Sequence, residues 1–316
     1  MTYISVKHIV IKASVFIFLA HCQIGYAQDT LTFKKTADGE ALRILSMKVN
    51  DRIPKKEKAP AFVLLCGGGW IDFTWFQLKD LARDLSSSGA QAYVVEYRTS
   101  KTFPGASPMD ALDDVHDAIY YLRENALKLN LDPDQVVVIG SSVGGHMAFA
   151  STLANPRKLA PFSKYRPNYI VAYSPVLRND SLGYGFDRIG AENAEWFSPW
   201  NVYTETPARM VPSLIFSGDQ DHHIKIDDLK TFEAKAREKG DDIALVVIPD
   251  VGHSMIKQRP DIYEYTAPQI LSFLEQQKMQ FSPLKRSMLY FILGIVIGIG
   301  MFIYLVRRRR INARRS

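Results

Sequence analysis

A serine lies at the centre of a glycine-flanked turn. Residues 140–144 read Gly-Ser-Ser-Val-Gly, after the apolar run 135–140 and before a segment, 145–153, that favours a helix. A sharp strand-to-helix turn lifts the central hydroxyl out of the sheet, and glycines are needed because side chains would clash there. This context favours Ser142 as a nucleophile over a purely structural turn.

A serine hydroxyl is a weak nucleophile and needs a base. His253 lies in the loop 249–254, just past the apolar run 244–248. Carboxyl ends of strands are where an open α/β sheet keeps its reactive groups, so we predict that His253 is the base. The other histidines lie near the N-terminus, inside predicted helices or in a second loop: His8, His21, His116, His146, His222 and His223.

The base needs a carboxylate that orients it. The apolar run 213–218 leads into Asp219-Gln220-Asp221-His222-His223. Asp221 lies farther round this loop than its rival, Asp219, and is the predicted acid, with Asp219 structural. The histidine pair does not predict a metal site, because adjacent side chains point apart and no further ligand cluster is visible.

A glycine-rich loop follows another buried strand. Residues 66–70 read Cys-Gly-Gly-Gly-Trp after the apolar run 61–66. Three glycines let backbone amides approach a developing oxyanion, and the amide of Val143 would complete the hole; a plain glycine turn is the alternative. A thiol nucleophile at Cys66 is disfavoured, because no base is paired with it.

Strand-like and helix-like segments alternate along residues 28–278, which predicts one α/β domain with a mostly parallel sheet and helices on both faces. Ser107, Pro108 and Asp110 form a start signal for one long helix that should run to about Leu129. Further segments read as strands or helices: 30–36, 41–50, 91–97, 169–173, 226–239 and 266–278.

Residues 179–200 have no clear place in this core pattern and are rich in aromatic side chains. Insertions of this kind often cover a pocket, and we expect a small lid here, with sugar stacking as the alternative. Trp70 and Trp196 are the candidate side chains of the substrate pocket.

The two ends of the chain predict a membrane protein. Residues 1–27 resemble a secretory signal, with Lys7 and Lys12 before a short apolar run; an uncleaved anchor is the alternative. Residues 288–306 contain no charge and are long enough to span a bilayer, after a tether at 279–287. The arginine-rich tail 307–316 should be cytoplasmic, which leaves the domain periplasmic or extracellular.

The net charge of +6 arises from these ends. Residues 28–284 hold 29 basic and all 33 acidic side chains, a net charge of −4. A basic surface for phosphate backbones is therefore missing, and no nucleic-acid partner is expected. The two cysteines, Cys22 and Cys66, give no internal disulfide once the signal is removed.

These residues resemble the α/β-hydrolase superfamily, and within it the secreted carboxylesterase and acetylesterase group. The likeness covers about residues 40–275. It rests on CGGGW at 66–70, EYR at 96–98, FP at 103–104, DVHDAIYYL at 114–122, GSSVGG at 140–145, GDQDHHI at 218–224 and GHS at 252–254. The resemblance implies a triad of Ser142, Asp221 and His253, oxyanion donors at Gly68, Gly69 and Val143, and a structural Asp114. Cys66 stands where the family usually has a histidine.

The sequence thus predicts a membrane-anchored serine esterase that needs no cofactor or metal and acts on short-chain or acetyl esters, either small molecules or glycans. Two alternatives stay open: an inactive hydrolase fold used for adhesion or scaffolding, and a small serine peptidase of the same fold.

Overall fold

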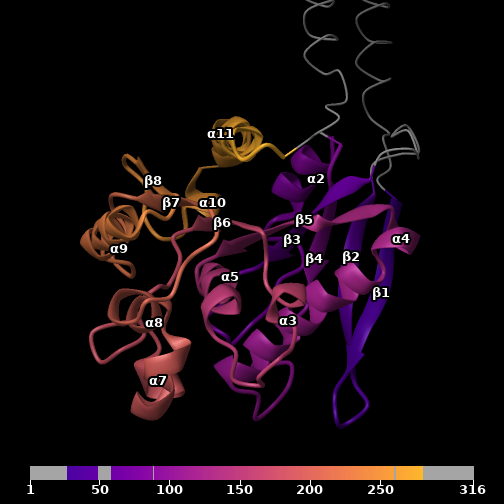
Figure 1. The fold of residues 1–316 in the computed structure, drawn as a ribbon, viewed down its shortest axis with the longest axis horizontal. Helices are drawn as coiled ribbons and strands as arrows, with labels where there is room; N and C mark the ends of the chain where they lie inside the picture. The colour runs from indigo at the N-terminus through magenta and orange to yellow at the C-terminus, as the bar shows by residue number, and fades with distance from the viewer. Residues whose placement is uncertain (1–26, 49–57, 88, 260, 280–316) are drawn as a thin grey trace, which may run out of the picture.

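The computed structural model describes residues 27–48, 58–87, 89–259 and 261–279, which form a single twisted sheet flanked by helices (Figure 1). The eight strands lie in the order β1-β2-β4-β3-β5-β6-β7-β8. From β4 to β8 all neighbours are parallel, while β1 and β2 are antiparallel additions at one edge. The mostly parallel sheet predicted from the sequence is confirmed. The strands are β1 (Ala27–Lys35), β2 (Ala41–Lys48), β3 (Ala59–Leu65), β4 (Gln91–Val95), β5 (Leu131–Ser141), β6 (Tyr169–Tyr173), β7 (Ser213–Gly218) and β8 (Ile243–Ile248).

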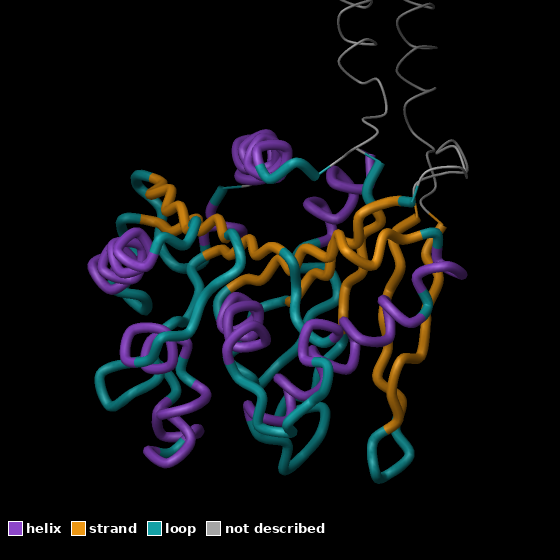
Figure 2. The backbone as a smooth tube through the Cα atoms, in the orientation of Figure 1, coloured by secondary structure: helices purple, strands orange, loops and turns teal. Residues whose placement is uncertain are grey.

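Helices cover both faces of the sheet, as expected for strands that are apolar along their whole length. Every residue of β3 and of β7 is buried. Helices α2 (Lys79–Ser87), α10 (Met255–Gln258) and α11 (Ile262–Gln276) pack on one face. On the other face lie α3 (Pro108–Glu124), α5 (Val143–Leu153), α8 (Pro199–Glu205) and α9 (Ile226–Lys239). Figure 2 shows the strands as a layer between these two groups.

The long helix expected from Ser107 to Leu129 is two helices, α3 and α4 (Ala126–Leu129). Its start is as predicted, since Ser107 and Asp110 form a reciprocal capping box. It is interrupted at Asn125, whose side-chain amide donates to the carbonyl of Tyr121. Such a local bond offers the backbone an alternative to the helix. Helix α11 begins at Ile262, four residues earlier than predicted, because Ile262 and Tyr263 are buried against the sheet.

The predicted signal, apart from Ala27 at the start of β1, lies outside the described residues. So do the membrane segment 288–306, the tail 307–316 and the tether beyond Met279. Within the part of the chain that the structure describes, no helix is both long and apolar enough to cross a bilayer.

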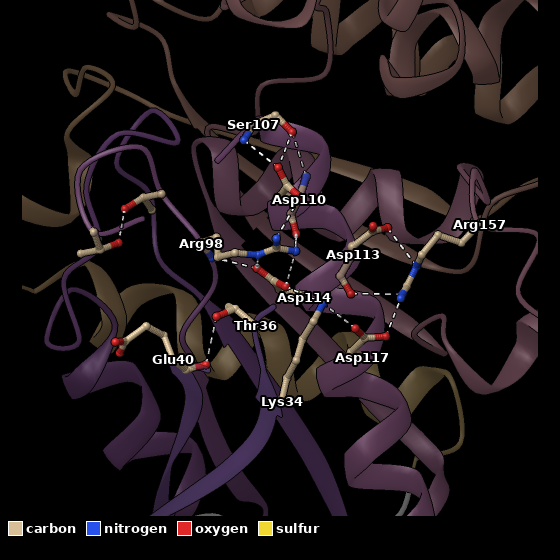
Figure 3. Close-up of polar contacts among 12 residues, drawn as sticks. Lys34, Thr36, Glu40, Arg98, Ser107, Asp110, Asp113, Asp114, Asp117 and Arg157 are labelled. Atoms are coloured by element: carbon tan, nitrogen blue, oxygen red, sulfur yellow. Dashed lines mark hydrogen bonds and ion pairs between the residues drawn. The ribbon is translucent and has the colours of Figure 1, made fainter. Parts of the chain in front are cut away.

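A buried carboxylate ties the antiparallel edge of the sheet to helix α3 (Figure 3). The side chain of Asp114 is fully buried and accepts hydrogen bonds from the guanidinium and backbone amide of Arg98 and from the ammonium of Lys34. Two residues beyond Arg98, the amide of Ser100 donates to the carbonyl of Trp70. The ion cluster therefore anchors a loop that supports the glycine-rich segment 66–70.

We expect Asp114→Asn to lower the free energy of unfolding by about 2 kcal/mol, because it removes the buried counter-charge of Arg98 and Lys34 and leaves them only their partly exposed partners, Asp110 and Asp117. Urea denaturation measures this change. Glu124→Gln is the control: it removes an exposed pair with Lys164 and should leave the midpoint unchanged. Equal midpoints for both variants would contradict the anchoring role of Asp114.

Candidate active site

Ser142 occupies a strained turn between β5 and α5. Its backbone has φ 55° and ψ −118°, a conformation that non-glycine residues rarely adopt. A Cβ atom at Gly140 would lie 2.2 Å from the carbonyl oxygen of Gly144, and one at Gly144 would lie 2.1 Å from that of Leu65. Both glycines of the pattern are therefore required by close backbone approach, and the turn presents the Ser142 hydroxyl beyond the end of the strand.

The structure brings Ser142, His253 and Asp221 together. The Oγ atom of Ser142 lies 2.9 Å from Nε2 of His253, and Nδ1 of His253 lies 2.9 Å from Oδ2 of Asp221. Asp221 follows β7 and His253 follows β8, so the carboxyl ends of three parallel strands supply the three side chains. This is the geometry of a nucleophile, its general base and the acid that orients the base.

Asp221 is held as a carboxylate by its surroundings. Its side chain has no exposed surface, and Oδ1 accepts the backbone amides of His223 and Ile224, each at 2.9 Å. Burial acts against the charged form, but the bonds from His253 and from the amide of Ile224 outweigh it and lower the pKa of Asp221. The acid thus stays ionised through neutral and mildly acidic pH.

Asp219, the alternative candidate for the acid that orients His253, instead connects two loops. Its Oδ1 atom accepts the amide of Asp250 at 2.8 Å, and its own amide donates to the carbonyl of Ile248. Asp250 has φ 60°, and His253 lies three residues farther on. Asp219 therefore shapes the loop that carries the base and does not touch the imidazole.

The glycine-rich loop lies beside the nucleophile. A Cβ at Gly67 would lie 3.1 Å from that of Ser142, while a Cβ at Gly68 would lie 2.1 Å from the carbonyl oxygen of Asp72. In the described residues, the amides of Gly68 and Gly69 have no hydrogen-bond acceptor. Val143 is the first residue of α5, where an N–H group has no partner within the helix. Donors are thus available on both sides of the Ser142 hydroxyl, as an oxyanion hole requires.

Two side chains hold this loop that sequence reasoning did not single out. The side-chain oxygen of Gln77 accepts the amide of Gly67, and the guanidinium of Arg188 donates to the carbonyl of Gly69. Gln77 lies two residues before the start of α2, and Arg188 lies in the insertion 179–200. No pattern in the sequence marks either of them as a partner of the loop.

Cys66 is fully buried behind the same loop. Burial raises the pKa of its thiol to about 12, although the amides of Leu78 and Gln77 act in the opposite direction. The thiol is therefore protonated at neutral pH and has no access to a substrate, so Ser142 is the nucleophile that the geometry supports.

A cavity of about 260 Å³ opens at the Ser142 hydroxyl. Its walls come from the glycine-rich loop, the nucleophile turn and the loops that carry the acid and the base. The lining residues are Gly67, Gly68, Gly69, Gln77, Ser141, Ser142, Val176, Tyr184, His223, Ile224, His253, Ser254, Ile256 and Lys257.

The two tryptophans predicted to line this pocket lie elsewhere in the structure. Trp70 is only 3% exposed, and its ring contacts the edge of His146 at a centroid distance of 5.2 Å. It turns inward because the insertion closes over it, where a Cβ at Gly185 would lie 2.8 Å from the indole. Trp196 lines a separate cavity beside Leu153.

The insertion meets the cavity through Tyr184 and forms α6 (Phe186–Ile189), α7 (Ala191–Phe197) and the start of α8. The insertion thus forms one wall of the cavity, which agrees with the expected small lid. In the described part of the chain no group of histidine, cysteine and acidic side chains is arranged to hold a metal ion. His223, from the pair considered for that role, lies with its ring 5.0 Å from the ring of His253.

Comparison with known proteins shows which superfamily the chain resembles. The BD-FAE family model matches residues 51–172, a stretch that includes the glycine-rich loop and Ser142 but ends before Asp221. A putative α/β hydrolase of Acanthamoeba polyphaga mimivirus is 28% identical over 62% of this chain and 57% of its own length. An ethyl acetate hydrolase of Pseudomonas putida is 31% identical over 55% of this chain and 54% of its own. The chain therefore spans about half the length of these curated relatives.

Among solved structures, an esterase of Thermogutta terrifontis superposes with a TM-score of 0.71, at 21% identity, over 82% of this chain and 94% of that one. This likeness shows the fold. The nucleophile, acid and base also follow one another in the chain order of α/β-hydrolases. The chain has the α/β-hydrolase fold, and the proteins that it resembles include carboxylesterases and acetylesterases of that superfamily.

Ser142→Ala should lower kcat for ester hydrolysis by about 10⁴- to 10⁶-fold with an unchanged thermal midpoint, because it removes the attacking oxygen without disturbing the turn. Steady-state kinetics and a melting curve measure the two quantities. Ser141→Ala, in the neighbouring position of the turn, is the control and should retain activity. If the two effects were exchanged, Ser142 would not be the nucleophile.

Asp221→Asn should lower kcat by about 10⁴-fold, because an amide in place of the carboxylate favours the wrong imidazole tautomer. Asp219→Asn should cost far less, since Asp219 contacts only the backbone of the His253 loop. Kinetics of the two isosteric variants across pH compare them directly. If Asp221→Asn were almost normal and Asp219→Asn nearly inactive, Asp219 would be the acid that orients His253.

Proposed function

We propose that the protein is a serine esterase that hydrolyses carboxylic esters of short acyl chains through an acyl-enzyme. The observation that carries this proposal is the chain of 2.9 Å contacts from Ser142 through His253 to Asp221 at the mouth of a cavity. The ethyl acetate hydrolase of Pseudomonas putida and the Thermogutta esterase, which has been solved with propionate and with butyrate bound, support it.

Each proton has a carrier in this mechanism. Ser142 Oγ attacks the ester carbonyl while His253 Nε2 takes its proton, and the Nδ1–H group stays bonded to Asp221. The amides of Gly68, Gly69 and Val143 stabilise the oxyanion of the tetrahedral intermediate. His253 then protonates the leaving alcohol. A water molecule, activated by the same imidazole, hydrolyses the acyl-enzyme and restores Ser142.

The relatives indicate the length of the acyl chain. The name of the Pseudomonas putida relative is that of an enzyme for an acetyl ester, and the Thermogutta esterase has been solved with propionate and with butyrate bound. The proposal therefore favours acetyl to butyryl groups over long fatty acyl groups, on either small alcohols or glycans.

We expect kcat/KM for ethyl acetate and ethyl butyrate to exceed that for ethyl decanoate by at least about tenfold, because glycines and polar side chains form most of the cavity wall and offer a long alkyl chain little apolar surface. Release of ethanol measures all three rates with one product. Acetylated xylo-oligosaccharides, assayed by released acetate, extend the series to glycan esters. Hydrolysis of peptide amides at rates comparable to those of esters would instead favour a peptidase, and no turnover of any ester would contradict the proposal.

We also propose that the enzyme is anchored by residues 288–306, with its hydrolase domain outside the cytoplasm and residues 307–316 inside. Support comes from the uncharged run of 19 residues and from the arginines that follow it.

A protease added to intact cells, or to bacteria with only the outer membrane opened, should digest the domain and spare a tag fused after Ser316. The membrane protects the tag because the basic tail stays on the cytoplasmic side. A cytoplasmic protein serves as the control for cell integrity. Loss of the tag with a protected domain would reverse the topology.

A further inference from the structure

The cavity at Ser142 has a charge pattern that the domain as a whole does not have. Residues 28–284 carry a net charge of −4, yet none of the residues that line the cavity is an aspartate or a glutamate. Its wall contains one permanent cation, Lys257, together with the imidazoles of His223 and His253. The local charge is therefore opposite in sign to that of the surrounding domain.

Two carboxylates close to this cavity are already paired with other groups. Asp221 has no exposed surface, and its two oxygens are occupied by His253 and by backbone amides. Asp72, beside the glycine-rich loop, forms an ion pair with Lys101. Lys257 itself is exposed and has no ion pair among the described residues.

A second cavity adjoins the first, and the carboxylate in its wall is also paired with a cation. It shares Tyr184, His223 and Ile224 with the first cavity. The carboxylate in its wall, Asp228, is paired with Arg178. Lys225, also in that wall, has no ion pair within the described residues. Neither cavity thus offers a free negative charge to an approaching ligand.

The position of Lys257 indicates which part of a substrate it would meet. His253 has to protonate the leaving oxygen, so the alcohol of the ester lies along the wall that His253 provides. Helix α10 begins directly after His253 and Ser254. Lys257 belongs to this helix and lies in the same wall of the cavity. The carbonyl oxygen instead faces the glycine-rich loop on the other side of Ser142.

We propose that the enzyme prefers esters whose alcohol part carries a carboxylate, which Lys257 attracts and holds. This inference rests on the proposed esterase activity and names its substrate class. Because the lysine is exposed, the attraction is modest and is screened by salt. It acts on the bound ester and the transition state alike, so it lowers KM and leaves kcat nearly unchanged.

The test compares two acetate esters that differ only in charge, 4-acetoxybutanoate and its neutral amide, 4-acetoxybutanamide, by the acetate they release. We expect the full-length enzyme to favour the anion by about fivefold in kcat/KM at low salt, through KM. Lys257→Met should abolish this preference, and Lys257→Glu should invert it. Lys128→Met, an exposed lysine on α4 with no ion pair in the described residues, is the matched control and should keep the preference.

A second pair places the charge on the acyl side: ethyl hydrogen succinate and ethyl succinamate, assayed by released ethanol. A smaller preference for the anion in this pair supports the alcohol-side position of Lys257, and an equal or larger one overturns it. The proposal also fails if wild type hydrolyses 4-acetoxybutanoate no faster than its amide, or if Lys257→Met slows both esters equally. Wild type that hydrolyses none of the four esters would contradict the esterase activity itself.

Discussion

The strained backbone of Ser142 is the constraint on which the rest of the site depends. A residue with φ 55° and ψ −118° persists only where the surrounding structure holds it. Here the amide of Ser142 donates to the carbonyl of Tyr173 on β6, and the carbonyl of Ser142 accepts the amides of His146 and Val176. Neighbouring elements on both sides therefore fix the turn, and the hydroxyl points away from the sheet toward His253.

The parallel sheet converts this local turn into a complete site. Strands β5, β6, β7 and β8 run side by side in one direction, so the loops after them leave from the same edge. Gly218 is paired with Ile248 in register, and a Cβ at Gly218 would lie 2.0 Å from the carbonyl oxygen of Val251. The loops that carry Asp221 and His253 are thus packed against each other before any side chain is considered. The pairing of β7 with β8 and the hydrogen bond of Asp219 to the loop after β8 set the distance between acid and base.

Much of this arrangement could be predicted from the sequence, because the relevant signals are local. Glycines around Ser142 and the apolar runs before Asp221 and His253 identify strand ends, and strand ends in a parallel sheet lie together. The supports of the glycine-rich loop could not be predicted in this way. Gln77 and Arg188 reach it only through the tertiary fold, and neither belongs to a pattern.

The assignment of Trp70 to the pocket failed for the same physical reason. Its φ of 58° and the packing of Gly185 turn the indole into the interior, and neither feature can be read from the sequence around position 70. The break between α3 and α4 falls at Asn125, whose side chain bonds to the carbonyl of Tyr121 within an otherwise helical pattern. Sequence periodicity identifies the layers, whereas the direction of single side chains depends on contacts between distant segments.

The central claim is that the turn and the His253–Asp221 pair make one hydroxyl in this chain a nucleophile. Reaction of the full-length protein with a fluorophosphonate, followed by peptide mass spectrometry, tests it most directly. The structure predicts a single adduct, on Ser142, because only this hydroxyl is paired with the base that activates it. An adduct on Ser141 or on another serine, or an unmodified protein, would contradict the account.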